Sequence, residues 1–372
     1  FAFTAGSGYN KKDMVRIAAA HTDYPYLRIK PNPDFMTNSY AQVNVEVYGG
    51  PILNTWFDRP LGVAGRVAIK SEDVFNPRMV LYRSEKPVMI IPNLAIHMSR
   101  SSNESKQLNP QKDLLPLCGG NLTKDGFEEM IAKESGVEKE DILSYDLFLY
   151  NRMRGTTLGI NEEFVAAPKL DDLECAYSSI EGMLNAKLSK DYVTVCAVFD
   201  NEEVGSGTKQ GAGSTFFPEV LKRISYLCGK NEEEYYMAVA DSFMLSADNA
   251  HAVHPNYQDK TDPTNRPYIN EGIVLKYNAS QKYTTDANSA ALVKYLCKKE
   301  KIKCQVFFNR SDMLGGSTLG NILTGQVSIK AADIGLPQLS MHSTYETAGC
   351  KDLDDMITLM GSFYELGKEV QI

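Results

Sequence analysis

Several short apolar runs in this chain stop abruptly at a histidine or an aspartate. Three of them are Val15–Ala20, Val193–Phe199 and Phe243–Ala247, which end at His21, Asp200 and Asp248. Uninterrupted apolar runs of this length are typical of strands that are buried on both faces of a sheet. The chain is therefore expected to form a sheet in which several strands end at polar side chains.

Apolar residues at helical spacing follow some of these runs. One set is Leu173, Tyr177, Ile180, Leu184 and Leu188, and another is Leu353, Met356, Ile357, Met360, Phe363 and Tyr364. Such spacing indicates helices with an apolar stripe. Strands that alternate with helices predict an α/β fold.

The stretch between the first two runs has a different character. It contains alternating segments such as Ala41–Tyr48 and Gly65–Lys70, many turn residues, and one helical patch over Asp125–Ser135. These features predict a strand-rich domain at residues 28–163, inserted into an α/β domain made of residues 1–27 and 164–372.

Composition excludes several classes of function. The formal net charge is −8 and no sustained Lys/Arg stripe is present, so neither nucleic acid nor an anionic membrane surface is an expected partner. No apolar stretch approaches the roughly 20 residues of a membrane span, and no signal peptide is recognisable. The seven cysteines contain no C-x-x-C pair, which favours a reducing, cytoplasmic location. Because the chain begins at Phe1, we expect it to start inside a longer protein.

The polar residues at the strand ends are the candidate site. Ligands in open α/β sheets bind outside the carboxyl ends of the strands. The segments that supply imidazoles and carboxylates there are Ala20–Asp23, Lys169–Asp172, Asp200–Glu203, Ser246–Asp248 and Pro337–His342. Two imidazoles and three carboxylates suit a pair of divalent ions that share one bridging carboxylate.

Two local patterns add to this hypothesis. Adjacent side chains diverge, so one member of the Glu202–Glu203 pair can bind metal while the other carries a proton. In His21-x-Asp23, the acid can orient the imidazole through its second ring nitrogen.

Purely structural roles compete with ligand roles at several positions. Asp172 fits a helix cap better than a ligand, and Asp200 fits a hydrogen-bonded strand end equally well. His251 and His254 have the spacing of ligands on one helical turn, but Pro255 disfavours a helix there.

Two glycine-rich segments imitate nucleotide-binding loops. Gly205–Gly211 has its third glycine one position late for a dinucleotide fingerprint, and Gly315–Gly320 lacks the lysine of a P-loop. We interpret the second segment as a tight turn, with backbone N–H groups that face a substrate carboxylate as the alternative.

With these residues in hand, the sequence resembles the aspartyl aminopeptidase family of dinuclear zinc aminopeptidases. The segments that carry the resemblance occur in the family's order and are Ala20-His-Thr-Asp23, Trp56-Phe-Asp-Arg59, Ala95-Ile-His97, Ala167-Pro-Lys-Leu-Asp171, Asp200-Asn-Glu-Glu-Val-Gly-Ser206, His251-Ala-Val-His-Pro-Asn-Tyr257 and Pro337-Gln-Leu-Ser-Met-His-Ser343. One departure is Asp172, where the family commonly has asparagine.

The resemblance implies a mixed central sheet flanked by helices, of the zinc-exopeptidase type, with an inserted domain used for oligomerisation. The ligands that it implies are His21, Asp248 and bridging Asp171 for one ion, and His342, Glu203 and the same Asp171 for the other. Glu202 is then the general base, and Asp23 orients His21. Two divalent ions are expected, with Zn²⁺ as the metal and Co²⁺ or Mn²⁺ also compatible with the ligands.

The family's substrates are peptides with a free N-terminus, and the branch that resembles this chain removes Asp or Glu. Lys276 occupies a position similar to a lysine of that branch, and a surface lysine at a strand end is the alternative. His97 is expected to enter a neighbouring subunit's substrate pocket, within a homo-oligomer that is typically a dodecamer built from dimers. Competing functions are a neutral-residue aminopeptidase, a dinuclear deacylase or carboxypeptidase, and a non-catalytic shell protein.

Overall fold

The computed structural model describes residues 1–6, 15–100, 103, 107–120, 126–187 and 192–367. The chain divides into two compact units. The first comprises Phe1–Tyr24, Thr156–Met341 and Glu346–Ile372, and the second comprises Pro25–Gly155 and His342–Tyr345. The second unit is strand-rich and interrupts the first in sequence between Tyr24 and Thr156, whereas the predicted insertion runs over residues 28–163.

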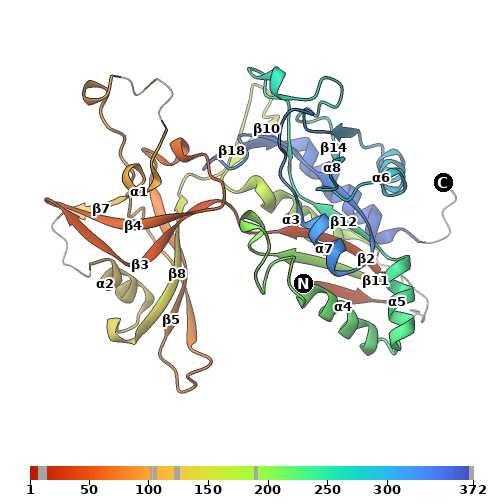
Figure 1. Ribbon diagram of the computed structural model, residues 1–372, viewed down its shortest axis with the longest axis horizontal. Helices are drawn as coiled ribbons and strands as arrows, with labels where there is room; N and C mark the ends of the chain where they lie inside the picture. The colour runs from red at the N-terminus through yellow and green to blue at the C-terminus, as the bar shows by residue number, and fades with distance from the viewer. Residues whose placement is uncertain (7–14, 101–102, 104–106, 121–125, 188–191, 368–372) are drawn as a thin grey trace. The chain divides into compact units, whose positions relative to one another are not determined.

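Within the described residues, the central sheet of the first unit has seven strands in the order β1-β11-β2-β12-β16-β14-β15 (Figure 1). Strands β11, β2, β12 and β16 run parallel, whereas β1 at one edge and β14 with β15 at the other run the opposite way. The bounds are β1 Ala2–Ala5, β2 Val15–His21, β11 Val193–Phe199, β12 Phe243–Ala247, β14 Ile273–Lys276, β15 Cys304–Phe307 and β16 Lys330–Gly335. The predicted mixed α/β class is confirmed, and the three apolar runs are β2, β11 and β12.

Helices cover both faces of this sheet. Alternate residues of β2 point to opposite sides. Ala18 and Ala20 pack in a core with helices α3, α6 and α8, whereas Ile17 and Ala19 pack with α4, α5 and α7. The bounds are α3 Leu170–Asn185, α4 Phe216–Leu227, α5 Glu232–Asp241, α6 Ala287–Glu300, α7 Leu319–Gln326 and α8 Cys350–Glu365.

Helix α3 forms as its apolar spacing predicts, but the large apolar side chains of the predicted stripe do not face the core. Leu173, Tyr177, Ile180 and Leu184 are 39–72% exposed. The buried face carries Met183 together with small and polar side chains, among them Glu174, Cys175, Ser178 and Gly182. Leu188 of the predicted stripe lies outside the described residues.

A second sheet of the first unit has the order β13-β17-β18-β10-β9 in the described part of the chain. Its strands are β9 Thr156–Leu158, β10 Phe164–Ala167, β13 Ala250–His251, β17 Pro337–Leu339 and β18 Glu346–Gly349. Strand β10 leads into α3, and β13 follows β12 closely. This small sheet therefore holds the segments that flank two of the candidate ligands.

The second unit is built on an antiparallel sheet with the order β6-β5-β8-β3-β4-β7 among its described residues. Its elements are β3 Tyr26–Thr37, β4 Tyr40–Tyr48, β5 Leu61–Ile69, β6 Arg78–Arg83, α1 Pro110–Asp113, β7 Leu117–Gly120, α2 Gly126–Ser135 and β8 Ile142–Asn151. The predicted helix is α2, although Asp125 lies outside the described residues. One core that includes Trp56, Leu61 and Phe127 stabilises the unit.

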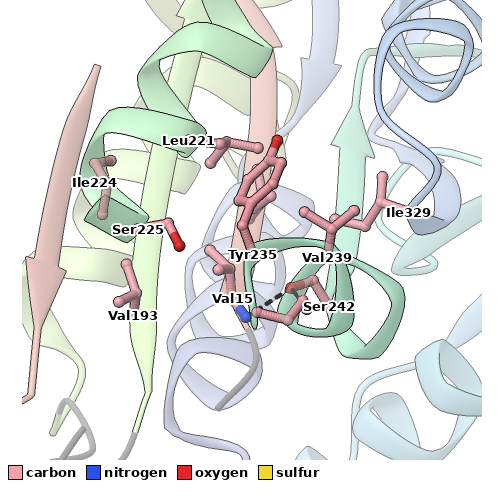
Figure 2. A pocket seen from close by; sticks show the side chains of 11 residues that line it. Val15, Val193, Leu221, Ile224, Ser225, Tyr235, Val239, Ser242 and Ile329 are labelled. Atoms are coloured by element: carbon pink, nitrogen blue, oxygen red, sulfur yellow. Dashed lines mark hydrogen bonds between the residues drawn. The ribbon is translucent and has the colours of Figure 1, made fainter. Parts of the chain in front are cut away.

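A cavity of about 20 Å³ lies in the core between the starts of β2 and β11 and the helices α4 and α5 (Figure 2). Its walls are mostly apolar, and Ser225 and Ser242 are among the lining residues. Among the described residues, the Ser225 Oγ has no hydrogen-bond partner. This end of the sheet is opposite to the carboxyl ends of the parallel strands.

Candidate metal centre

Three adjacent parallel strands bring candidate residues to one edge of the central sheet. Strand β2 ends at His21, which lies level with Phe199, the last residue of β11. Strand β12 is the other neighbour of β2, and its register places Asp248 at the same level. The carboxyl ends of these strands therefore meet where the sequence analysis expected ligands.

Asp171 reaches the site from the start of α3. Lys169 adopts a left-handed conformation with φ of 66°, and Asp171 and Asp172 have non-helical backbone angles joined by a cis peptide bond. The backbone N–H of Asp171 donates to Glu346 Oε2 over 3.0 Å. The chain thus turns sharply at Asp171 and is held there by a buried carboxylate.

His21, Asp171 and Asp248 form a buried group of possible ligands. Their donor atoms lie within 4.8 Å of one another. His21 Nε2 is 3.9 Å from Asp171 Oδ1 and 3.9 Å from Asp248 Oδ1. Zinc lies about 2.0–2.2 Å from nitrogen and oxygen ligands, so two ligands of one ion can stand up to about 4 Å apart. The imidazole and the two carboxylates therefore fit a divalent ion.

The charge around this group also suits a cation. Burial raises the pKa of Asp248, and repulsion from Asp171 adds to the effect, although Lys276 and His21 oppose it. Burial likewise raises the pKa of Asp172, with Asp248 and Asp171 contributing. Burial opposes protonation of His21, but Asp23 and the nearby carboxylates outweigh it and raise the pKa of His21. Carboxylates concentrated in this way are stabilised by a bound divalent ion.

Asp23 fixes the orientation of His21 and also holds the Glu-Glu segment. His21 Nδ1 lies 3.3 Å from Asp23 Oδ1 and 3.1 Å from the Asp23 carbonyl oxygen. This contact leaves Nε2 pointing at Asp171 and Asp248. The two oxygens of the Asp23 carboxylate accept the backbone N–H groups of Glu202 and Glu203, at 3.0 and 3.1 Å. The predicted contact with His21 is present, and the bonds to the Glu-Glu segment were not predicted.

Glu202 and Glu203 form a short 3₁₀ turn, η4, over Glu202–Val204, directly after β11. Asn201, in a left-handed conformation, redirects the chain into this turn. Burial raises the pKa of Glu202 to about 7, and the carboxylates of Asp248, Asp171 and Asp23 add to this, while His21 lowers it. A carboxylate with a pKa near neutrality suits a general base.

Two predicted site residues belong to the second unit. His342, in a left-handed conformation, lies in the segment His342–Tyr345, and its Nδ1 is 3.0 Å from the Gly50 carbonyl oxygen. His97 is exposed in the 3₁₀ turn η2, Ile96–Met98. Their parts in the second ligand set and in a neighbouring pocket stay predictions.

Lys276 is not a surface lysine. It is the last residue of β14, is 2% exposed, and donates to the carbonyl oxygens of Asp248 and Asn249 over 2.9 and 3.1 Å. Its Nζ is also 3.3 Å from Asp248 Oδ2. Burial opposes its charge, but Asp248 outweighs this and raises the pKa of Lys276. The surface interpretation was wrong, whereas a substrate contact stays a prediction.

Asp172, His254 and the second glycine-rich segment each have defined hydrogen-bond partners. The Asp172 carboxylate does not cap α3, because Oδ2 accepts the backbone N–H of His21 over 3.1 Å. His254 is half-buried and its Nδ1 accepts the N–H of Asn256. The Gly315 carbonyl oxygen accepts a bond from Lys282, and α7 begins at Leu319 with Thr318 as its cap. The cap predicted for Asp172 was therefore wrong, since its carboxylate supports the backbone at His21.

A buried polar network behind the ligands was missed by the sequence analysis. The Asn249 side-chain nitrogen donates to the Leu170 carbonyl oxygen, to Gln338 Oε1 and to Glu174 Oε2, over 3.0, 3.1 and 3.3 Å. Leu170 precedes Asp171 and Asn249 follows Asp248, so these bonds connect two segments that carry candidate ligands. The one feature of the sequence that could have indicated this network is position, since Asn249 and Leu170 are each next to a predicted ligand.

A family model described as aminopeptidase I zinc metalloprotease (M18) matches residues 1–364. The chain belongs to the M18 aminopeptidase family. It is a zinc aminopeptidase, a metal-dependent hydrolase that acts on peptides. The resemblance to the aspartyl aminopeptidase family is confirmed at this level.

Individual relatives agree along nearly the whole chain. The probable M18 family aminopeptidase 2 of Clostridium acetobutylicum is 46% identical over 372 residues, which are 98% of this chain and 85% of that protein. A chain from a cryo-EM structure of the Ape4 and Nbr1 complex aligns with a TM-score of 0.93 and 35% identity, over 98% of this chain and 74% of that one. The S. cerevisiae mApe1 dodecamer aligns with a TM-score of 0.83 and 27% identity, over 98% and 82% of the two chains.

Among the described residues, no helix combines the length and the apolar character needed to cross a bilayer.

Proposed function

We propose that this M18 aminopeptidase removes N-terminal residues from peptides with two divalent metal ions, most simply Zn²⁺. The observation that carries the proposal is the convergence of His21, Asp171 and Asp248 beside Glu202 at one sheet edge. These three residues would hold one ion. By resemblance, Asp171, Glu203 and His342 would hold the other.

The chemistry divides between the ions and the protein. Bound divalent ions polarise a scissile carbonyl and make a water molecule more acidic. Glu202 takes the proton of the attacking water and returns it to the amine of the leaving peptide. Asp23 keeps Glu202 in place through the backbone N–H and keeps His21 turned towards its ion.

The adjacent glutamates offer a matched test. Glu202→Gln should lower kcat by about 10²–10⁴-fold while the protein still binds two ions per chain, because a general base contributes about this factor. Glu203→Gln, with the same chemical change one residue away, should lose one ion. Metal content is measured by elemental analysis alongside peptide hydrolysis. A near-normal rate for Glu202→Gln would show that another group is the base.

The substrate preference has two candidates. We propose Asp and Glu at the peptide N-terminus, supported by the resemblance. The intramolecular bonds of Lys276 favour the neutral-residue alternative, because the cation expected to read an acidic side chain already has partners. Peptides with N-terminal Asp, Glu, Leu or Met, tested after metal removal and readdition, decide between them.

A deacylase or carboxypeptidase remains a distinct candidate for the same metal centre. The proposed aminopeptidase requires a free amine on its substrate. It should cleave an unblocked peptide and leave the N-acetylated form intact. Preferential cleavage of the blocked peptide would favour the deacylase.

We propose further that the protein is a homo-oligomer, a dodecamer built from dimers through the second unit, in the cytoplasm. The support is the solved mApe1 dodecamer and, for the location, the seven cysteines, which are all free thiols. If His97 acts in a neighbouring subunit, coexpression of His97→Ala and Glu202→Gln chains should restore activity that each variant lacks alone. Activity that stays absent in mixed oligomers would contradict this role.

A further inference from the structure

Cys297 and Cys304 are two thiols that take no part in the proposed reaction. Cys297 lies in the last turn of α6 and is 1% exposed, whereas Cys304 is the first residue of β15 and is half-buried. Both pack into the core that α6 and α8 form with the central sheet. Both are free thiols. Their arrangement therefore raises the question of what two neighbouring thiols could do together.

The turn between α6 and β15 brings the two thiols into contact. Lys301 adopts a left-handed conformation with φ of 59° where the helix ends. The backbone N–H of Ile302 donates to the Cys297 carbonyl oxygen over 2.8 Å, so the chain folds back across the end of the helix. The thiols of Cys297 and Cys304 are hydrogen-bonded to each other across this turn. The two sulfur atoms therefore already face one another.

The two thiols differ in acidity and in access to solvent. The hydrogen bond with Cys297 lowers the pKa of Cys304, and Lys294 lowers it further, although burial opposes both effects. The same hydrogen bond raises the pKa of Cys297, and burial adds to this. A thiolate that solvent can reach is the reactive form of cysteine. Cys304 should therefore react first, and Cys297 is in position to react with the product.

We propose that Cys297 and Cys304 form a reversible oxidation site, in which a peroxide oxidises Cys304 and Cys297 then closes a disulfide with it. A low-molecular-weight peroxide such as hydrogen peroxide is the oxidant. Such pairs of a reactive and a resolving cysteine are typical of thiols that are oxidised reversibly. The disulfide would connect the end of α6 to the start of β15.

The reaction has two steps that balance. The Cys304 thiolate attacks one oxygen of hydrogen peroxide, the O–O bond breaks, and the second oxygen takes up a proton and leaves as water. The Cys297 sulfur then attacks the sulfur of the Cys304 sulfenic acid, the S–O bond breaks, and the oxygen leaves as a second water with the Cys297 proton. The two thiols lose two electrons, which reduce the peroxide. A thiol reductant reverses the disulfide, whereas sulfinic acid, the next product at an unresolved Cys304, is not reversed in this way.

The test treats the zinc-loaded full chain with increasing concentrations of hydrogen peroxide, since Zn²⁺ has no redox chemistry of its own. Peptide mass mapping with and without dithiothreitol identifies the oxidised cysteines, and dimedone traps any sulfenic acid. We expect a disulfide between the peptides of Cys297 and Cys304 at the lowest effective concentration. Dithiothreitol should remove it completely.

Two variants separate the roles of the thiols. Cys297→Ser should lose the disulfide and instead carry a dimedone adduct or a sulfinic acid at Cys304. Cys118→Ser is the matched control, because Cys118 is also a half-buried thiol and burial raises its pKa to about 11. This control should form the disulfide as the wild type does. Cys304→Ser serves if Cys297→Ser does not fold, and it should leave Cys297 unoxidised at the same concentration.

Two results would overturn the proposal. One is a wild-type protein in which Cys304 proceeds to sulfinic acid without a disulfide to Cys297. The other is a protein in which Cys118 is oxidised at lower peroxide concentration than Cys304. Both readouts are masses of peptides, so they do not depend on the peptidase activity.

Discussion

Two glycines at the contact between α3 and α8 should respond in opposite ways to the same substitution. These helices pack together on one face of the central sheet (Figure 1). A Cβ added at Gly182 of α3 would lie 2.5 Å from Met360 Cβ, 2.9 Å from the Gly361 nitrogen and 3.1 Å from the Ile357 carbonyl oxygen. A Cβ added at Gly361 of α8 would meet only the Gly182 carbonyl oxygen, at 3.6 Å.

The magnitudes follow from these distances. Carbon atoms make contact at about 3.5–4.0 Å, so Gly182→Ala forces the helices apart by about 1 Å. Overpacking of this kind costs about 1–3 kcal/mol, and the helix propensity of alanine returns about 1 kcal/mol. We expect Gly182→Ala to lower the free energy of unfolding by up to about 2 kcal/mol. Gly361→Ala gains the helix propensity of alanine without a steric clash, so it should raise the free energy of unfolding by up to about 1 kcal/mol.

Urea unfolding followed by circular dichroism measures both effects on otherwise identical protein. The difference between the two variants should be about 1–3 kcal/mol, which is the overpacking cost, because both variants gain the helix propensity of alanine. If Gly182→Ala is as stable as Gly361→Ala, the close approach of α3 and α8 is not a constraint on the fold.

Three further perturbations test other parts of the structure. Ser225→Ala should raise the free energy of unfolding by about 1–2 kcal/mol in urea titrations. It removes a buried hydroxyl that lacks a hydrogen-bond partner in the described structure, and alanine has the higher helix propensity. A lower free energy of unfolding would mean that the hydroxyl has a hydrogen-bond partner. Chelation of the metal should abolish hydrolysis and lower the midpoint of thermal unfolding. Zn²⁺ at about 100 times its Kd should restore about 2.7 kcal/mol of the free energy of unfolding, which scanning calorimetry can measure. A midpoint that does not change on chelation would count against a metal bound by the folded state. Burial raises the pKa of Asp352 to about 6 despite N–H bonds from Gly272 and Asn270. Its folded form thus holds a proton more tightly than its unfolded form, so the stability that this proton adds is present below about pH 4 and is lost as the pH rises to about 6. Asp352→Asn should flatten this slope in urea titrations, and an identical slope would refute the assignment.

The sequence was most informative where strands are buried on both faces. Parallel strands covered by helices appear as continuous apolar runs, so β2, β11 and β12 and the residues that end them could be located directly. The register of β2 with its neighbours then made the meeting of His21 and Asp248 a consequence of sheet geometry. His21 and Asp248 lie together because the ends of neighbouring strands adjoin in space, and their part as metal ligands stays a prediction.

Helix α3 shows what the sequence could not provide. Its large apolar side chains predicted the helix correctly, yet Tyr177 and Leu184 face outward. The buried face is chosen by its neighbours, because Glu174 joins the polar network and Gly182 admits α8. Such pairings depend on contacts between distant segments, which the spacing of apolar residues along one helix does not encode.

The hydrogen bonds of Asp23 have a consequence for the insertions and deletions that this enzyme can tolerate. One carboxylate receives N–H groups from two consecutive glutamates, and the same residue contacts the imidazole of His21. Glu202, the proposed base, is therefore anchored by the loop after β2 and not by its own strand alone. The side chains of Thr208 and Gln210 also support the turn, because both donate to Asn201 Oδ1. We expect an insertion or deletion of a single residue between Phe199 and Glu202 to break both bonds to Asp23 together and to disconnect Glu202 from the imidazole.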